Sequence, residues 1–258
     1  MLILLPASEA KTSVRSGTPL DPDGLSFPQL APSREAVLGA LIEVSAQPDA
    51  TLRLGVRRGL SEVVRANAAL RDAPAAVADA VYSGVLFDAI SLLDLEPAAR
   101  RRARAWIVVI SALWGAIRLG DRIPTYRLNM CGRLPGLDHL PQFWQPSLAE
   151  VLPTAAGRGL VVDLRAAEFL TAWRPAGLLA ERTLSVKVVR DLDSGRGAGS
   201  HNAKRTGGLV VRRIVTDAVD PRQPQDLAEA LSTHFDVALR PPGRAGQPWQ
   251  LLVVETKS

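Results

Sequence analysis

The chain has 258 residues, near the upper limit that one hydrophobic core serves, so residues 1–258 are predicted to form a single domain. Hydrophobic residues make up 47% of the chain and charged residues 22%, a composition that excludes an intrinsically disordered protein. No apolar run approaches the roughly 20 residues that cross a bilayer, so no membrane partner is predicted. The formal net charge of +5 is compatible with an anionic partner.

The first predicted element is a strand at residues 1–5, because this apolar run meets Pro6 and Glu9 too early to form a secretory leader, and we expect a cytoplasmic protein. Similar short apolar runs predict further strands at 107–111, 159–164, 185–190 and 249–255. Apolar residues at helical spacing predict helices at 34–47, 51–70 and 224–234, and Pro and Gly predict surface loops at 18–32 and 240–248. These elements predict an α/β fold (mixed α+β), with a mixed sheet flanked by helices in one compact domain.

No cofactor site is predicted from the sequence. The histidines, at 139, 201 and 234, do not have the local spacing of zinc ligands, and no GxxxxGK[ST] phosphate loop is present. The single cysteine, Cys131, excludes an internal disulfide. We interpret Cys131 as a buried, inert thiol, with a peroxide-sensing thiol as the alternative.

A first cluster of polar residues directly follows the first strand: Ser8, Glu9, Lys11 and Thr12. Residues at the end of a core strand are held by a rigid scaffold and face a crevice, so these side chains are candidates for anion binding or acid–base work. The alternative is that Ser8 or Thr12 caps a turn while Lys11 is solvated.

Two later segments also combine polar groups with an apolar setting. Arg127 follows Pro124 and Tyr126, which predicts an ordered loop that turns a guanidinium inward to a carboxylate or phosphate; an ion pair with Asp121 is the alternative. If Ala203 opens a helix, Lys204 lies near its positive end, where an anion would bind; a solvated basic loop is the alternative.

These motifs resemble, in order and spacing, those of the YaaA family of peroxide stress proteins. Pro6-x-Ser8-Glu9-x-Lys11-Thr12 resembles the family's opening motif in its longer form. The further similar segments are Val81-Tyr82-Ser83-Gly84, Leu113-Trp114-Gly115 with Pro124-x-Tyr126-Arg127, Gln142-Phe143-Trp144, Asp163-Leu164 with Glu168-Phe169, Lys187 on a strand, and Ala203-Lys204-Arg205. The resemblance covers almost the whole chain and implies a YaaA-like fold.

Two positions depart from the family pattern. Asp163 stands where the family has Asn, and Gly207 stands where it has Arg, so one acid is gained and one cation is lost. We expect these changes to alter an anion site at those points, as in a member specialised for a different ligand.

The resemblance implies a protein linked to the response to hydrogen peroxide, and one that binds double-stranded DNA through a helix-hairpin-helix-like element. In this chain the element would fall on the helical region 51–72, whose Arg57, Arg58 and Arg65 would contact phosphates, with a second basic cluster at 100–104.

The second hypothesis is a metal-free enzyme that acts on a small anionic or nucleobase-like substrate in a pocket built around Ser8, Glu9, Lys11 and Arg127. A carboxylate, a lysine and an arginine that lie close together shift one another's pKa and can share proton transfer. In this hypothesis Lys11, Glu9 and Tyr82 are catalytic. The groups that would bind the substrate or its anionic part are Ser8, Thr12, Ser83, Arg127, Lys187 and Lys204. An iron-binding role is not supported, because the sequence contains neither the Glu-x-x-His spacing nor the facial-triad pattern of iron ligands.

Overall fold

The computed structural model describes residues 1–256, except for the side chain of Arg58. Its core is a seven-stranded mixed sheet in the order β4-β3-β1-β6-β7-β9-β8. Its parallel strands are β1 (Leu2–Pro6), β3 (Ile107–Ser111), β6 (Val161–Asp163), β7 (Thr183–Val189) and β9 (Trp249–Val254). The antiparallel edges are β4 (Gly115–Arg118) and β8 (Val237–Arg240). The five predicted strands and the α/β class are thus confirmed.

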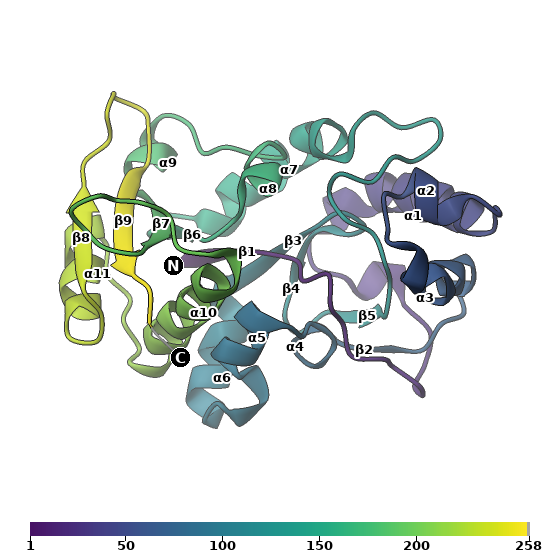
Figure 1. The fold of residues 1–258 in the computed structure, drawn as a ribbon, viewed down its shortest axis with the longest axis horizontal. Coiled ribbons are helices and arrows are strands. Elements are labelled where there is room, and N and C mark those ends of the chain that lie inside the picture. Colours follow the sequence, from purple (N-terminus) through teal and green to yellow (C-terminus); the bar gives the residue numbers. More distant parts are fainter. Residues whose placement is uncertain (257–258) are drawn as a thin grey trace.

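The central strands are runs of apolar residues because helices cover both faces of the sheet. Figure 1 shows α7 (Leu140–Ala156), α8 (Ala167–Leu170) and α9 (Leu178–Glu181) on one side of the sheet. On the other side lie α5 (Val85–Ile90), α6 (Pro97–Trp106) and α10 (Ser200–Thr216). Burial on both faces removes the alternation of polar and apolar residues that marks a one-sided sheet.

The remaining elements lie toward the two edges. Beside β8 packs α11 (Pro224–Ser232). Beyond β4 lies a lobe that contains α1 (Ala31–Ser45), α2 (Ala50–Arg53), α3 (Ser61–Ala66), and a small sheet of β2 (Ala75–Val77) and β5 (Arg122–Pro124) (Figure 1). Short connecting turns are α4 (Ala78–Val81), η1 (Pro22–Gly24), η2 (Pro28–Leu30), η3 (Arg58–Leu60), η4 (Asn67–Ala69) and η5 (Leu92–Asp94).

The order of the parallel strands creates a switch point in the sheet. After β1 the chain adds β3 on one side and then returns to the other side of β1 for β6, β7 and β9. In open α/β sheets of this order, ligands bind outside the carboxyl ends of the strands where the winding reverses. Here that position lies at the ends of β1, β3 and β6.

The predicted helix at 51–70 is wrong: the structure replaces it by α2, η3, α3 and η4. Gly55 interrupts the helix with a φ of 62°, in the left-handed region that glycine adopts readily. The interruption changes which residues face the core, so Leu54 is buried while Leu52 is 81% exposed. The segment is therefore a hairpin of short helices.

The helix that carries Lys204 begins earlier than predicted, at Ser200 instead of Ala203, and it includes the apolar residues up to Val215. It packs tightly against α5 because Gly208 has no side chain. A Cβ at Gly208 would lie 2.4 Å from the carbonyl oxygen of Leu86 and 2.7 Å from Cβ of Ala89. Gly208 thus serves the close packing of α10 against α5, whereas a Cβ at Gly207 would meet the side chain of Leu164 at 3.3 Å.

Candidate ligand site at the carboxyl ends of β1, β3 and β6

A cavity of about 460 Å³ lies at the switch point. Its wall is formed by residues 6–10 after β1, Ala112 after β3, Ala166, Glu168 and Phe169 after β6, residues 84–87 at the start of α5, residues 128–131, and Lys204 of α10. Segments that are far apart in the sequence meet here because the parallel strands end at one edge of the sheet. The volume is within the range of small-molecule sites.

Lys11 lies behind this wall rather than on it. Its Nζ donates a hydrogen bond to the carbonyl oxygen of Ser8 at 2.6 Å and lies 4.0 Å from the centre of the Tyr126 ring. Burial, and to a smaller extent repulsion from Arg127, lowers the pKa of Lys11 to about 7, although Glu9 opposes both effects. Near neutral pH the amine is therefore present in both protonation states.

Arg127 pairs with Glu9, as the cluster predicted from the sequence requires. The guanidinium donates to Glu9 Oε2 at 2.5 Å and to the Glu9 carbonyl oxygen at 3.1 Å. Asn67 fixes the backbone of Arg127 by donating to its carbonyl oxygen and accepting from its N–H. The alternative partner, Asp121, instead accepts hydrogen bonds from the Ser26 hydroxyl and the Arg118 N–H, so the predicted Arg127–Asp121 pair is wrong.

Tyr82 belongs to a buried chain of hydroxyl groups. The Ser111 hydroxyl accepts from the N–H groups of Leu113 and Trp114 and therefore donates to Tyr126 at 2.7 Å; Tyr126 in turn lies 3.0 Å from the Tyr82 hydroxyl. Burial raises the pKa of Tyr126 to about 12 and that of Tyr82 well above its usual value. Both tyrosines are neutral hydrogen-bonding groups at physiological pH.

The other predicted site residues divide into two groups. Ser8 and Lys204 line the cavity. Thr12 and Ser83 meet beside it through backbone hydrogen bonds, from Thr12 N–H to the Val81 carbonyl and from Ser83 N–H to the Ala10 carbonyl. Lys187 is exposed on β7, where its Nζ donates to the carbonyl oxygen of Gly195, and it does not line the cavity.

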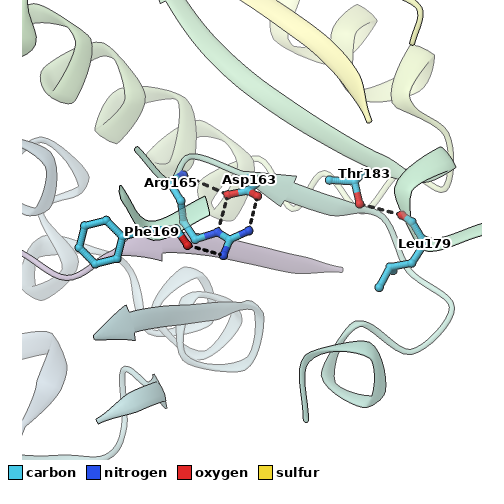
Figure 2. A network of polar contacts seen from close by, with 5 residues as sticks. All are labelled: Asp163, Arg165, Phe169, Leu179 and Thr183. Carbon is cyan, nitrogen blue, oxygen red and sulfur yellow. Dashed lines mark hydrogen bonds and ion pairs between the residues drawn. The ribbon is translucent and has the colours of Figure 1, made fainter. Parts of the chain in front are cut away.

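The acidic residue at position 163 forms an ion pair with a nearby arginine, Arg165. Asp163 and Arg165 are both buried and form two parallel hydrogen bonds, of 2.9 and 2.7 Å (Figure 2). Arg165 also donates to the carbonyl oxygen of Phe169, and thereby fixes a residue of the cavity wall. Because Arg165 balances the negative charge of Asp163, this departure from the expected pattern adds no net charge to the site. The identity of Asp163 alone did not indicate this.

Several wall residues could not be recognised from the sequence. Phe87 lies between recognised motifs, and Asn129 occupies the variable position between Leu128 and Met130 of a recognised motif, so nothing in the sequence marks either as a site residue. Arg165 could have been found from the sequence, because it lies two positions after Asp163 and a buried acid requires a partner. Cys131 was predicted to be buried, but it is exposed and lines the cavity, because it follows the buried Met130 in a turn.

The arginines assigned to DNA binding lie on the hairpin of α2 and α3. Arg57 and Arg65 are exposed and form no ion pair with any described side chain; the side chain of Arg58 lies outside the described part. In the second basic cluster, Arg100 and Arg104 pair with the buried Asp79 instead. That cluster is therefore largely occupied by structural contacts.

Two features of the described residues concern the predicted partners: clusters of metal ligands and helices that could cross a membrane. Within residues 1–256, no group of three or more His, Cys, Asp or Glu residues is arranged to hold a metal ion. Over the same residues, no helix combines the length and the apolar character needed to cross a membrane.

A family model described as peroxide stress protein YaaA matches residues 1–238. The chain belongs to the YaaA family. A UPF0246 protein of Streptomyces coelicolor is 44% identical over 257 residues, 98% of each chain. UPF0246 proteins of Corynebacterium efficiens and Corynebacterium glutamicum are 37% and 33% identical, over 84% and 88% of this chain and 85% and 90% of their own. The YaaA family motifs at Ser8–Thr12, Tyr82, Arg127 and Lys204 thus converge on or beside one cavity.

Proposed function

We propose that this YaaA family member is an enzyme whose substrate is a small polar molecule bound in the cavity at the ends of β1, β3 and β6. The position of the cavity at the switch point of the sheet carries the proposal, because this is where α/β sheets place their ligands. Family membership further supports a role for the reaction under peroxide stress.

Lys11 is the acid–base group in this proposal. A base works best when its pKa is near the operating pH, and the pKa of Lys11 is lowered to about 7. Its amine lies behind Ser8 and beside Tyr126, so this role requires the segment at residues 8–10 to move before a proton can pass between Lys11 and the cavity. Glu9 lines the cavity and orients the substrate, while Arg127, which does not line it, holds Glu9 in place through their ion pair.

Nuclear magnetic resonance of lysine Nζ and Cε nuclei tests this role. We expect the Lys11 signal, assigned by its loss in Lys11→Met, to titrate with a midpoint near pH 7, whereas a lysine peptide titrates at about pH 10.4. The unfolded chain keeps this proton up to about that higher pH, so the contribution of Lys11 to stability rises with pH between these two values. Lys11→Met should therefore be more stable than the wild type at pH 6, and the gain should shrink as the pH rises to 10.

Lys187→Met, which removes an exposed lysine outside the cavity, is the matched control and should leave the stability profile nearly unchanged. A Lys11 midpoint near that of the peptide would refute the acid–base role.

A second function, binding of double-stranded DNA by the hairpin of α2 and α3, is favoured by one further observation. Gly55 turns the chain between the two helices, and the exposed Arg57 and Arg65 follow on the same hairpin. Arginines presented in this way neutralise phosphates without reading the base sequence.

DNA binding is tested with a fluorescent duplex across a salt series. Replacing Arg57 and Arg65 by Ala should weaken binding about tenfold and reduce the slope of log affinity against log salt by about two, one for each phosphate that the variant no longer neutralises. The control is Arg174→Ala with Arg222→Ala, which removes the same charge from exposed arginines outside both the hairpin and the cluster at 100–104. Equal effects of the two double variants would mean that the hairpin is not the interface.

A further inference from the structure

Some of the charged side chains at the cavity have a partner within the protein, and others have none. Glu9 is neutralised by Arg127, and Lys11, behind the wall, is held by the Ser8 carbonyl and the Tyr126 ring. Two charged wall side chains remain, Glu168 and Lys204; both are exposed to solvent, and neither forms an ion pair with a described residue. The cavity thus offers one free negative and one free positive group.

The two free charges come from helices on opposite faces of the sheet. Glu168 lies on α8, directly after β6, and Lys204 lies in the second turn of α10. Both line the same cavity, yet they are not within 4.0 Å of each other, so the space between them separates an anion site from a cation site. A ligand that bridges them must carry both charges.

The surface between these charges is mainly apolar. The buried rings of Phe87 and Phe169 and the buried side chains of Leu86, Leu128 and Met130 line the cavity. Such a wall binds a large hydrocarbon or aromatic group, while a few polar groups fix its orientation.

We propose that the cavity binds a zwitterion with a large apolar group, the chemistry of an α-amino acid with an aromatic or aliphatic side chain. Lys204 binds the carboxylate, Glu168 binds the ammonium group, and Phe87 and Phe169 enclose the apolar group. This inference rests on the proposed function, because it takes the same cavity as the substrate site, and it differs from the small anionic or nucleobase-like substrate expected from the sequence.

A purely anionic ligand fits the cavity less well. Of the cations that the sequence assigned to such a ligand, Arg127 is paired with Glu9 and Lys187 lies outside the cavity. Lys204 alone remains, and the free carboxylate of Glu168 on the same wall repels an anion unless the ligand also carries a positive charge.

Isothermal titration calorimetry with three related probes tests the proposal on the full-length protein. L-Phenylalanine carries both charges, 3-phenylpropionate lacks the ammonium group, and phenethylamine lacks the carboxylate. We expect phenylalanine to bind at least about tenfold more tightly than either analogue, because each analogue leaves one wall charge without its partner.

Variants identify which residue reads which charge. In Lys204→Met, phenylalanine and phenethylamine should bind equally well; in Glu168→Gln, phenylalanine and 3-phenylpropionate should bind equally well. Lys187→Met and Glu181→Gln make the same changes outside the cavity and should retain the wild-type preference.

Equal binding of phenylalanine and 3-phenylpropionate to the wild type would overturn the inference, as would tighter binding of a nucleoside monophosphate or no binding of any of the three probes. The titration of Lys11 is measured without these probes. A normal Lys11 midpoint therefore refutes the acid–base role, whereas failure of the zwitterion leaves that role standing.

Discussion

Replacing Asp163 by Asn is expected to destabilise this protein by about 3 kcal/mol. The Arg165 side chain is completely buried, and its guanidinium donates to both carboxylate oxygens of Asp163 (Figure 2). An amide of the same size retains one acceptor and no charge, so the substitution leaves a buried cation unpaired. Such uncompensated charges are among the most destabilising single changes.

Urea unfolding of the wild type, Asp163→Asn, Arg165→Gln and the double variant measures this effect as a double-mutant cycle. The double variant should recover most of the lost stability, because it buries no net charge. Asp49→Asn breaks the exposed Arg53–Asp49 pair and should cost less than about 1 kcal/mol. A loss of similar size for Asp163→Asn would mean that the buried pair has little net influence.

The sheet was largely predictable because its strands are unusually apolar. All five residues of β3 are buried, so the run at 107–111 could hardly belong to another element. The edge strands β4 and β8 were not predicted, because short strands that pair on one side lack a strong pattern. The helix predicted at 51–70 failed at Gly55, where the apolar spacing continues although the backbone turns.

The candidate site was predictable only where short motifs follow strands. Ser8 and Glu9 reach the cavity because they directly follow β1, and the end of a central strand fixes their position. Side-chain partners depend on tertiary contacts that local spacing does not encode. Arg127 therefore pairs with Glu9, 118 positions away, instead of the nearby Asp121.

The same limit explains the basic cluster at 100–104. Its amphipathic helix reads as a surface rich in free arginines, yet Asp79 lies buried beneath Arg100 and Arg104. Arg102 donates to the carbonyl oxygens of Val215 and Thr216 at the end of α10. The number of arginines in the sequence therefore overstates the positive charge that is free to bind DNA. The DNA-binding hypothesis now rests on the arginines of the hairpin of α2 and α3.

Replacing Gly208 by Ala is expected to destabilise the protein by about 3 kcal/mol and to weaken ligand binding at the cavity. The new Cβ would lie 2.4 Å from the carbonyl oxygen of Leu86, a backbone atom that cannot rotate away. α10 must then move away from α5, and this displaces Lys204 from the wall that Leu86 also forms.

Gly39→Ala is the matched control, because Gly39 lies inside α1 with no atom within 4 Å of its added Cβ. This change should stabilise the protein by about 0.5 to 1 kcal/mol, since alanine favours the helix over glycine. Thermal unfolding of both variants, with calorimetry of phenylalanine binding, separates the two effects. If Gly208→Ala is as stable as Gly39→Ala, α10 adapts to the methyl group, and the close contact with α5 does not position Lys204.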